Sequence, residues 1–252
     1  MRKNDISLVD IPLVLVLLTR LPLPRLASDS FQRQSRAVWA FPLAGLAITL
    51  PACLLGLAAL ALGLPAGMVA GLVLLVQVLL TGAMHEDGLA DCADGFWGGF
   101  DPARRLEIMK DSQIGSYGVL ALVFAIGLRW QALTLLIGLG EIWSLLTIAM
   151  LSRAMMPVLM SWLPNARQSG LSRSVGRPSR RALSLGIGLA VLLSLPLLGS
   201  ASFALVLMLG CTTFGLGLLA RAKIGGQTGD VLGACQQLCE TIGMLTLVVL
   251  LN

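Results

Sequence analysis

The sequence has few charged residues, few aromatic residues and a single histidine. Only 12% of its 252 residues are charged, whereas 56% are hydrophobic, and the mean hydropathy is +0.87. An average soluble domain has about 25% charged residues, so this composition excludes an ordinary soluble protein. It indicates a protein that crosses the lipid bilayer several times.

The five cysteines form neither a metal-binding pattern nor a disulfide framework. They stand at positions 53, 92, 211, 235 and 239, mostly within apolar segments, as small buried side chains do. The formal net charge of +5 comes from basic residues without the interleaved aromatic residues of a nucleic-acid surface. The charge therefore favours contact with anionic lipid headgroups, and it predicts no nucleic-acid partner.

Seven apolar runs are long enough to cross about 30 Å of hydrocarbon, which takes roughly 20 residues. They cover residues 37–62, 67–84, 115–139, 142–163, 182–199, 201–220 and 231–251. The run at 11–18 is too short, and it favours an interfacial or re-entrant segment over a cleaved signal peptide. The pattern predicts an all-α, polytopic membrane bundle in which residues 1–252 form one domain.

Lys and Arg are distributed unevenly among the connections between these runs. If the N-terminus is cytoplasmic, the connections near 63–66, 140 and 200 lie outside, and they contain no Lys or Arg. The five arginines from 167 to 181 then lie inside, as the positive-inside rule requires. We therefore expect the functional groups described below to face the cytoplasm.

A cluster of acidic residues is the sharpest chemical signal. Seven of the 13 acidic residues lie between Glu86 and Asp111, and Asp87, Asp91 and Asp94 follow an i, i+4, i+7 spacing. On a helix these three carboxylates share one face, where they repel one another unless protons or a cation neutralise them. Hard oxygen ligands suit Mg²⁺ or Mn²⁺. We therefore predict that the three hold a metal ion and that they are catalytic residues, together with Asp111; a solvated acidic loop is the plainer alternative.

The neighbours of this cluster have supporting roles in this interpretation. Glu86 points to another helical face, and His85 is expected to be a hydrogen-bonding neighbour of the acids more than a catalyst. The glycines at 88, 95, 98 and 99 permit close approach of the backbone in a cavity for a bulky phosphorylated ligand.

A basic segment follows, and it contains candidate phosphate-binding residues. Arg104, Arg105 and Lys110 precede Ser112 and the glycines that open the next apolar run. Arginine suits diphosphate oxygens, and Ser112 is expected to cap a helix whose N-terminal amides leave room for a phosphate. The alternative is a simple basic anchor at the membrane surface.

Charged residues inside the apolar runs need partners. Arg153 is expected to face a wet cavity or a carboxylate, and Arg129, beside Trp130, is expected to snorkel to the outer interface. Asp230 opens the last run and Glu240 lies roughly 15 Å into it. We predict that these two acids form a second acidic wall which binds substrate with Arg153, although Asp230 also suits a helix dipole and Arg153 is a rival ion-pair partner for Glu240.

Ordered motifs across nearly the whole chain resemble the cobalamin synthase family, the adenosylcobinamide-GDP ribazoletransferases. They are His85-Glu86-Asp87-Gly88-Leu89-Ala90-Asp91-x-x-Asp94-Gly95, Arg105-x-x-x-Met109-Lys110-Asp111-Ser112-x-Ile114-Gly115-x-Tyr117-Gly118, Gly229-Asp230-x-x-Gly233-Ala234, and the N-terminal Leu18-Thr19-Arg20-Leu21-Pro22-Leu23-Pro24.

The resemblance implies a Mg²⁺-dependent enzyme of the bacterial inner membrane. Its implied substrates are adenosylcobinamide-GDP and α-ribazole or α-ribazole 5′-phosphate, and its products are adenosylcobalamin or its 5′-phosphate and GMP. The ribose 3′-hydroxyl of ribazole would attack the phosphorus that is attached to the cobinamide arm. Which carboxylate is the general base, how many metal ions bind and whether the protein is a homo-oligomer all stay open.

Two other classes of membrane protein compete with this interpretation. A CDP-alcohol phosphotransferase also sets acids on a membrane helix, but its D-G-x-x-A-R opening is absent because Asp91 follows Ala90. A cation transporter would need its acids near the bilayer midplane, whereas most acids here lie at one predicted face. Both comparisons favour the transferase.

Overall fold

The structure, a computed structural model, describes residues 6–251, and these residues form helices and turns without a β-strand. Seven helices correspond to the seven predicted runs, so the predicted all-α membrane bundle is confirmed. They are α3 (Phe41–Ala61), α4 (Ala66–Thr81), α7 (Ser116–Gly138), α8 (Ser144–Trp162), α10 (Arg180–Leu198), α11 (Ala201–Ile224) and α12 (Gly229–Leu251). Within the described residues, six helical segments are long and apolar enough to cross a membrane, and a bent pair raises the number to seven.

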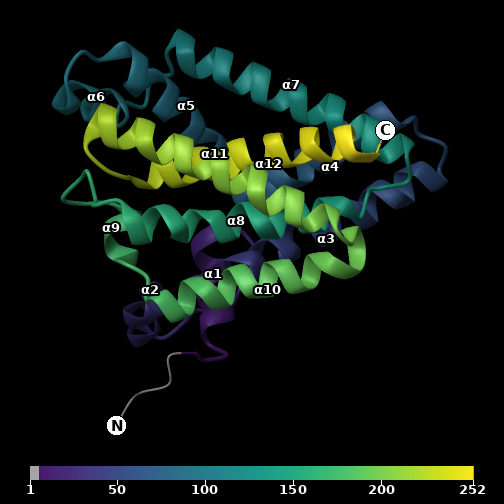
Figure 1. Cartoon of the computed structure of the whole chain (residues 1–252), viewed down its shortest axis with the longest axis horizontal. Coiled ribbons are helices and arrows are strands. Elements are labelled where there is room, and N and C mark those ends of the chain that lie inside the picture. The colour runs from purple at the N-terminus through teal and green to yellow at the C-terminus, as the bar shows by residue number, and fades with distance from the viewer. Residues whose placement is uncertain (1–5, 252) are drawn as a thin grey trace.

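The long helices lie side by side along the longest axis of the molecule (Figure 1). Helix α8 is the centre of the bundle, since it packs against α3, α10, α11 and α12 and most of its residues are buried. Helices α7 and α10 instead leave most of their apolar side chains at least partly exposed. Exposed apolar faces of this extent suit contact with lipid.

A sharp bend joins α4 to the next helix, α5 (Met84–Gly98), at 87°. Gly82 and Ala83 both adopt left-handed backbone conformations there, with φ of 65° and 57°. Ala83 is the only residue other than glycine with positive φ between residues 6 and 251. The segment between the predicted runs at 67–84 and 115–139 therefore contains two helices, α5 and α6 (Pro102–Ile108), of which α5 turns back into the bundle.

Helix α5 packs tightly against the start of α12. A Cβ atom on Gly88 would lie 2.7 Å from the carbonyl oxygen of Asp230, and one on Gly233 would lie 3.2 Å from the Cα of His85. Small residues allow this close approach in membrane proteins, where van der Waals packing replaces the hydrophobic effect. The close approach places the acidic side chains of the two helices at the same end of the bundle.

The N-terminal segment forms a short buried helix, α1 (Asp10–Leu18), which is followed by η1 (Ser28–Arg33), α2 (Gln34–Ala37) and η2 (Val38–Ala40). The prediction that it is too short to span is confirmed, since it has nine residues. After it the chain turns back, and the amide of Arg20 donates to the carbonyl of Leu80, 2.7 Å away at the end of α4.

The carboxylate of Asp10 anchors this segment. It accepts hydrogen bonds from Arg33 Nε at 2.8 Å, Trp39 Nε1 at 3.0 Å and the amide of Ser7 at 2.9 Å. Burial raises the pKa of Asp10, but these hydrogen bonds and the charge of Arg33 outweigh burial, so the pKa lies below its usual value of 3.8. The five cysteines are free, and four of them are buried, as predicted.

Candidate functional site

A polar cavity of about 320 Å³ lies beside the first turns of α5 and α12. The connection between α8 and the short helix α9 (Leu171–Val175) forms its other wall. Its charged lining residues are Asp87, Asp230, Arg167 and Arg173. The cavity therefore brings together segments that are far apart in the sequence.

The acidic cluster is assembled from two helices at this cavity. Residues 84–98 are helical, which confirms the conformation on which the one-face prediction for Asp87, Asp91 and Asp94 rests. Asp87 is exposed and Asp91 is half-buried. Asp91 interacts electrostatically with Asp230, Asp87 and Asp94. Asp230 of α12 therefore lies beside the acidic residues of α5, whereas the predicted substrate-binding role of Asp230 stays a prediction.

Arg167 is a site residue that the sequence analysis missed. Its guanidinium forms an ion pair with Asp230 at 2.8 Å, and it also interacts electrostatically with Asp91. It lines the polar cavity and an adjoining cavity of about 410 Å³, which Lys110 also lines. In the sequence Arg167 was one of several arginines that indicated topology, and no local signal distinguished it from the others.

Hydrogen bonds between two connections of the chain hold Arg167 beside the start of α12. The amide of Ala166 donates to the carbonyl of Gln227 at 2.9 Å, and the amide of Gln227 donates to the carbonyl of Pro164 at 2.8 Å. The side chain of Gln227 also donates to Asn165 Oδ1 at 2.8 Å and accepts a hydrogen bond from Ser172. The α8–α9 connection is therefore fixed to the α11–α12 connection, and the ion pair is held in place.

Asp94 has a different environment from the other acids of the cluster. It is buried, and its two oxygens accept hydrogen bonds from the amides of Gly115 at 2.7 Å and Gly118 at 2.9 Å. Both glycines are needed, because a Cβ atom on either would collide with the carboxylate. Asp94 thus fixes the start of α7, and its sharing of a metal ion with Asp87 and Asp91 stays a prediction.

Two expectations for the start of α7 are wrong. Ser112 does not cap the helix, because the N-cap residue is Gly115 and no side chain forms a capping hydrogen bond there. The amides that were expected to receive a phosphate are already occupied by Asp94. The contact of Asp94 from α5 with this helix end is a tertiary contact that leaves no local signal in the sequence.

The predicted phosphate-binding residues of the basic segment have unequal environments. Arg104 pairs with Glu107 at 2.6 Å on an exposed surface. Arg105 donates to the carbonyls of Gly99 and Lys223, at 2.9 Å each, and so joins α6 to the turn after α5 and to α11. Lys110 is exposed, and its side chain borders the cavity that Arg167 also lines.

Asp111, the fourth predicted catalytic residue, is exposed and lies outside the polar cavity. Its Oδ1 accepts a hydrogen bond from the amide of Gln113 at 3.1 Å. With Lys110 and Arg104 it lines a separate cavity of about 290 Å³. The structure therefore does not bring Asp111 to the acidic cluster.

The donor chemistry of the cluster fits Mg²⁺ when a substrate supplies further oxygens. In the part of the chain that the structure describes, no three His, Cys, Asp or Glu side chains are arranged to hold a metal ion by themselves. Proteins usually bind Mg²⁺ through one or two carboxylates, with water and substrate phosphates completing the octahedron. Asp87, Asp91 and Asp230 offer carboxylate oxygens of this kind beside a cavity.

Arg129 does not snorkel to the outer interface, so that prediction is wrong. Its side chain is 2% exposed and pairs with Glu240 at 2.6 Å. It also donates to Gln237 at 2.6 Å, and lies 3.4 Å from Glu86 and Gln77. These residues come from α4, α5, α7 and α12, so the network ties four helices together within the bundle.

Arg153 and Glu240 form an ion pair, as the rival interpretation expected. Arg153 Nη1 lies 3.0 Å from Glu240 Oε1, while the other oxygen of Glu240 receives Arg129. Both side chains of the pair are at most 3% exposed. The pair lies inside the buried network. Neither Arg153 nor Glu240 lines the polar cavity, so the structure does not place them in contact with a substrate there.

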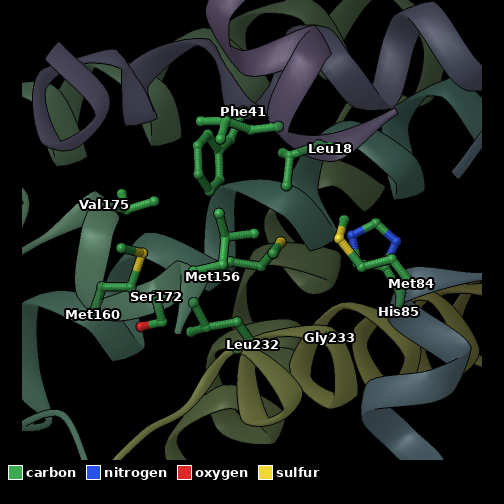
Figure 2. A pocket seen from close by; sticks show the side chains of 13 residues that line it. Leu18, Phe41, Met84, His85, Met156, Met160, Ser172, Val175, Leu232 and Gly233 are labelled. Carbon is green, nitrogen blue, oxygen red and sulfur yellow. The ribbon is translucent and has the colours of Figure 1, made fainter. Parts of the chain in front are cut away.

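His85 does not form the hydrogen bond that was expected of it. Its side chain is 1% exposed, and neither ring nitrogen has a hydrogen-bond partner. Figure 2 shows the ring in a second, apolar pocket, beside Met84 and below Leu18.

Comparison with known proteins identifies the family. A sequence model of the cobalamin-5-phosphate synthase family matches residues 10–248. A Sinorhizobium protein described as adenosylcobinamide-GDP ribazoletransferase is 46% identical over 247 residues, which cover 92% of this chain and 94% of that protein. Proteins with the same description from Azorhizobium caulinodans and Rhizobium meliloti are 45% and 43% identical, and the matches cover 92% and 95% of this chain and 92% and 97% of those proteins. No solved structure matches. The chain therefore belongs to the cobalamin-5-phosphate synthase family, and it is a transferase of cobalamin biosynthesis.

Proposed function

We propose that this protein joins adenosylcobinamide-GDP to α-ribazole or α-ribazole 5′-phosphate with the help of Mg²⁺. The products are adenosylcobalamin or its 5′-phosphate and GMP. The observation that carries the proposal is the convergence of Asp87 and Asp230 with Arg167 at one polar cavity, where Asp91 interacts electrostatically with all three. The relatives whose printed descriptions name this activity support the choice of substrates.

The reaction exchanges one phosphorus–oxygen bond for another. The ribose 3′-oxygen of ribazole bonds to the phosphorus on the cobinamide arm, and the bond from that phosphorus to the bridging oxygen of the diphosphate breaks. The electron pair of the broken bond leaves with GMP. The hydroxyl proton passes to one of the clustered carboxylates, which acts as general base.

The residues at the cavity divide this work between them. Asp87, Asp91 and Asp230 would hold the Mg²⁺ ion, which would neutralise charge on the diphosphate. Arg167 and Lys110 border adjoining cavities, where they bind the phosphate oxygens of the departing GMP. We further propose that the protein lies in the bacterial inner membrane, with this cavity facing the cytoplasm, where a GDP-linked substrate is made.

The test uses purified protein in liposomes with adenosylcobinamide-GDP and α-ribazole phosphate. We expect GMP release that needs both substrates, stops with a chelator and resumes with added Mg²⁺. Asp87→Asn and Asp91→Asn keep side-chain volume, and each should lower turnover at least 100-fold. Asp29→Asn is the matched control, because Asp29 is an exposed carboxylate away from the cavity. Turnover near wild type in both cluster variants would contradict the site, and no GMP release from the wild type would favour a transporter.

A further inference from the structure

An apolar pocket of about 40 Å³ adjoins the polar cavity. Figure 2 shows its walls, which include Phe41, Met84, His85, Met156, Met160 and Val175. The pocket shares four lining residues with the polar cavity, namely Met84, Leu171, Ser172 and Gly229. The two cavities are therefore neighbours, and these four shared residues lie at the boundary that a ligand in the polar cavity would have to pass to extend a group into this pocket.

His85 is the polar group of this pocket that lacks a partner. Ser172 also lines the pocket, but its hydroxyl is already hydrogen-bonded to Gln227 and Asn165. Both nitrogens of His85 are buried and unpaired, although buried polar atoms in folded proteins nearly always find partners. A neutral imidazole offers one donor and one acceptor, so the pocket presents one hydrogen-bonding position within apolar walls.

We propose that this pocket binds the heteroaromatic base of the nucleoside acceptor and that His85 donates a hydrogen bond to the free ring nitrogen of that base. The inference rests on the proposed function, in which the acceptor is α-ribazole, a riboside of dimethylbenzimidazole. Such a base is uncharged and apolar except at one ring nitrogen. Its character matches a pocket with apolar walls and one buried donor.

The pocket is lined by methionine side chains that can move aside to admit an aromatic ring. The present cavity holds only a few water-sized positions, so a bicyclic base enters only when side chains move aside. Met84, Met156 and Met160 have flexible thioether chains that adapt to irregular ligands and make favourable contacts with aromatic rings. We infer that they rotate when the base enters, while Val175 of the short helix α9 forms part of the pocket wall beside Met160.

This placement orients the acceptor for the reaction. Asp87 lies two residues after His85 on α5 and lines the polar cavity, whereas His85 lines the apolar pocket. With its base held at His85, the nucleoside extends its ribose toward Asp87 and Asp230. His85 is thus a specificity-determining residue, and it takes no part in bond making.

The first experiment tests the wild-type protein, so that no variant needs to fold. GMP release is measured with α-ribazole and with the α-riboside of dimethylindole, in which a carbon atom replaces the free ring nitrogen. We expect the KM of the indole riboside to be at least 10-fold higher, with the KM of adenosylcobinamide-GDP unchanged. Equal KM values for the two ribosides would contradict the proposed hydrogen bond from His85 to the ring nitrogen of the base.

The second experiment tests His85 itself. His85→Phe keeps a ring but has no nitrogen, so it should raise the KM of α-ribazole at least 10-fold and abolish the difference between the two ribosides. Equilibrium dialysis of α-ribazole without Mg²⁺ should show the same loss of affinity. Val175→Phe fills the pocket from α9 and should weaken both ribosides, whereas Met208→Leu, at an exposed position of α11, is the control and should change neither.

The outcomes separate this proposal from the proposed function. If the wild type releases GMP but His85→Phe and Val175→Phe leave the riboside KM values unchanged, the pocket assignment falls and the activity stands. If the wild type releases no GMP with either riboside, the activity itself falls. Loss of cobinamide-GDP affinity in His85→Phe without loss of riboside affinity would place the wrong substrate in the pocket and would also overturn the proposal.

Discussion

Replacement of Gly88 by alanine tests whether the packing of α5 against α12 sets the geometry of the proposed active site. The added Cβ atom would lie 2.7 Å from the carbonyl oxygen of Asp230, whereas ordinary contact begins near 3.4 Å, so the two backbones must separate by roughly 0.7 Å. The Cα of Asp230 and that of Gly233 would also be too close, at 3.1 and 3.2 Å. No flexible side chain is available to yield at this contact, and the helices themselves must move.

We expect Gly88→Ala to destabilise the protein by about 1–3 kcal/mol, as overpacking usually does. The loss of turnover should be larger than stability explains, because displacements near 1 Å at a reacting centre can cost about 100-fold in rate. Thermal unfolding in detergent gives the first quantity, and GMP release at a temperature where the variant stays folded gives the second.

The matched control is Gly127→Ala on α7, where an added Cβ atom meets nothing within 4 Å. Alanine favours a helix over glycine by about 1 kcal/mol, so this variant should be as stable as the wild type or more so, and fully active. Wild-type turnover in Gly88→Ala would refute the claim that the separation of these two helices sets the geometry of the acids.

Three further predictions concern other parts of the molecule. Arg129→Leu removes one of the two arginines that pair with Glu240 and the arginine that pairs with Glu86, and breaking a buried charge network should lower the free energy of unfolding by about 3–5 kcal/mol. The exposed Arg221→Leu is the control, and equal stability of the two variants would argue against the network. Asp10 has a lowered pKa, so its contribution to stability is full above the unfolded pKa of 3.8 and is lost as the pH falls through the lower folded pKa. In Asp10→Asn the free energy of unfolding should therefore depend less on pH below about pH 4. An unchanged acid transition would contradict the assignment. Single cysteines at 101 and 170 in a cysteine-free chain should resist a membrane-impermeant thiol reagent in intact cells and react after permeabilisation, whereas labelling of either in intact cells would overturn the cytoplasmic orientation.

The sequence predicted the helices well because their signal is local and strong. An apolar run long enough to span a bilayer has few alternatives to a helix, since unpaired backbone groups in hydrocarbon are costly. The exception is the run at 67–84, which ends at Thr81 and bends. Ala83 adopts a left-handed conformation there, and alanine gives no sequence signal of such a turn.

The partners of charged residues were harder to predict because they depend on tertiary contacts. The sequence placed Asp230 and the acidic cluster at the same predicted cytoplasmic face, but it paired Asp230 with Glu240 and not with Arg167. Arg129 was misassigned because its neighbour Trp130 resembles an interfacial anchor, and only the packing of α7 against α5 and α12 shows that its guanidinium points inward. Arg167 and Asp94 likewise depend on contacts with helices that are distant in sequence.

The buried charge network and the residues around the polar cavity differ in their ratio of acidic to basic side chains, and this difference supports the proposed role of the cavity. Inside the bundle, Arg129 and Arg153 face Glu86 and Glu240, so the formal charges cancel and the network needs no ligand. Around the cavity, the three carboxylates of Asp87, Asp91 and Asp230 outnumber the two arginines, Arg167 and Arg173, and among these residues the one ion pair in the described part of the chain joins Arg167 to Asp230. Carboxylates in excess repel one another, and a divalent cation relieves that repulsion while it attracts a diphosphate. A membrane protein that balances its buried charges but leaves its cavity acidic is suited to bind a cation together with an anionic substrate.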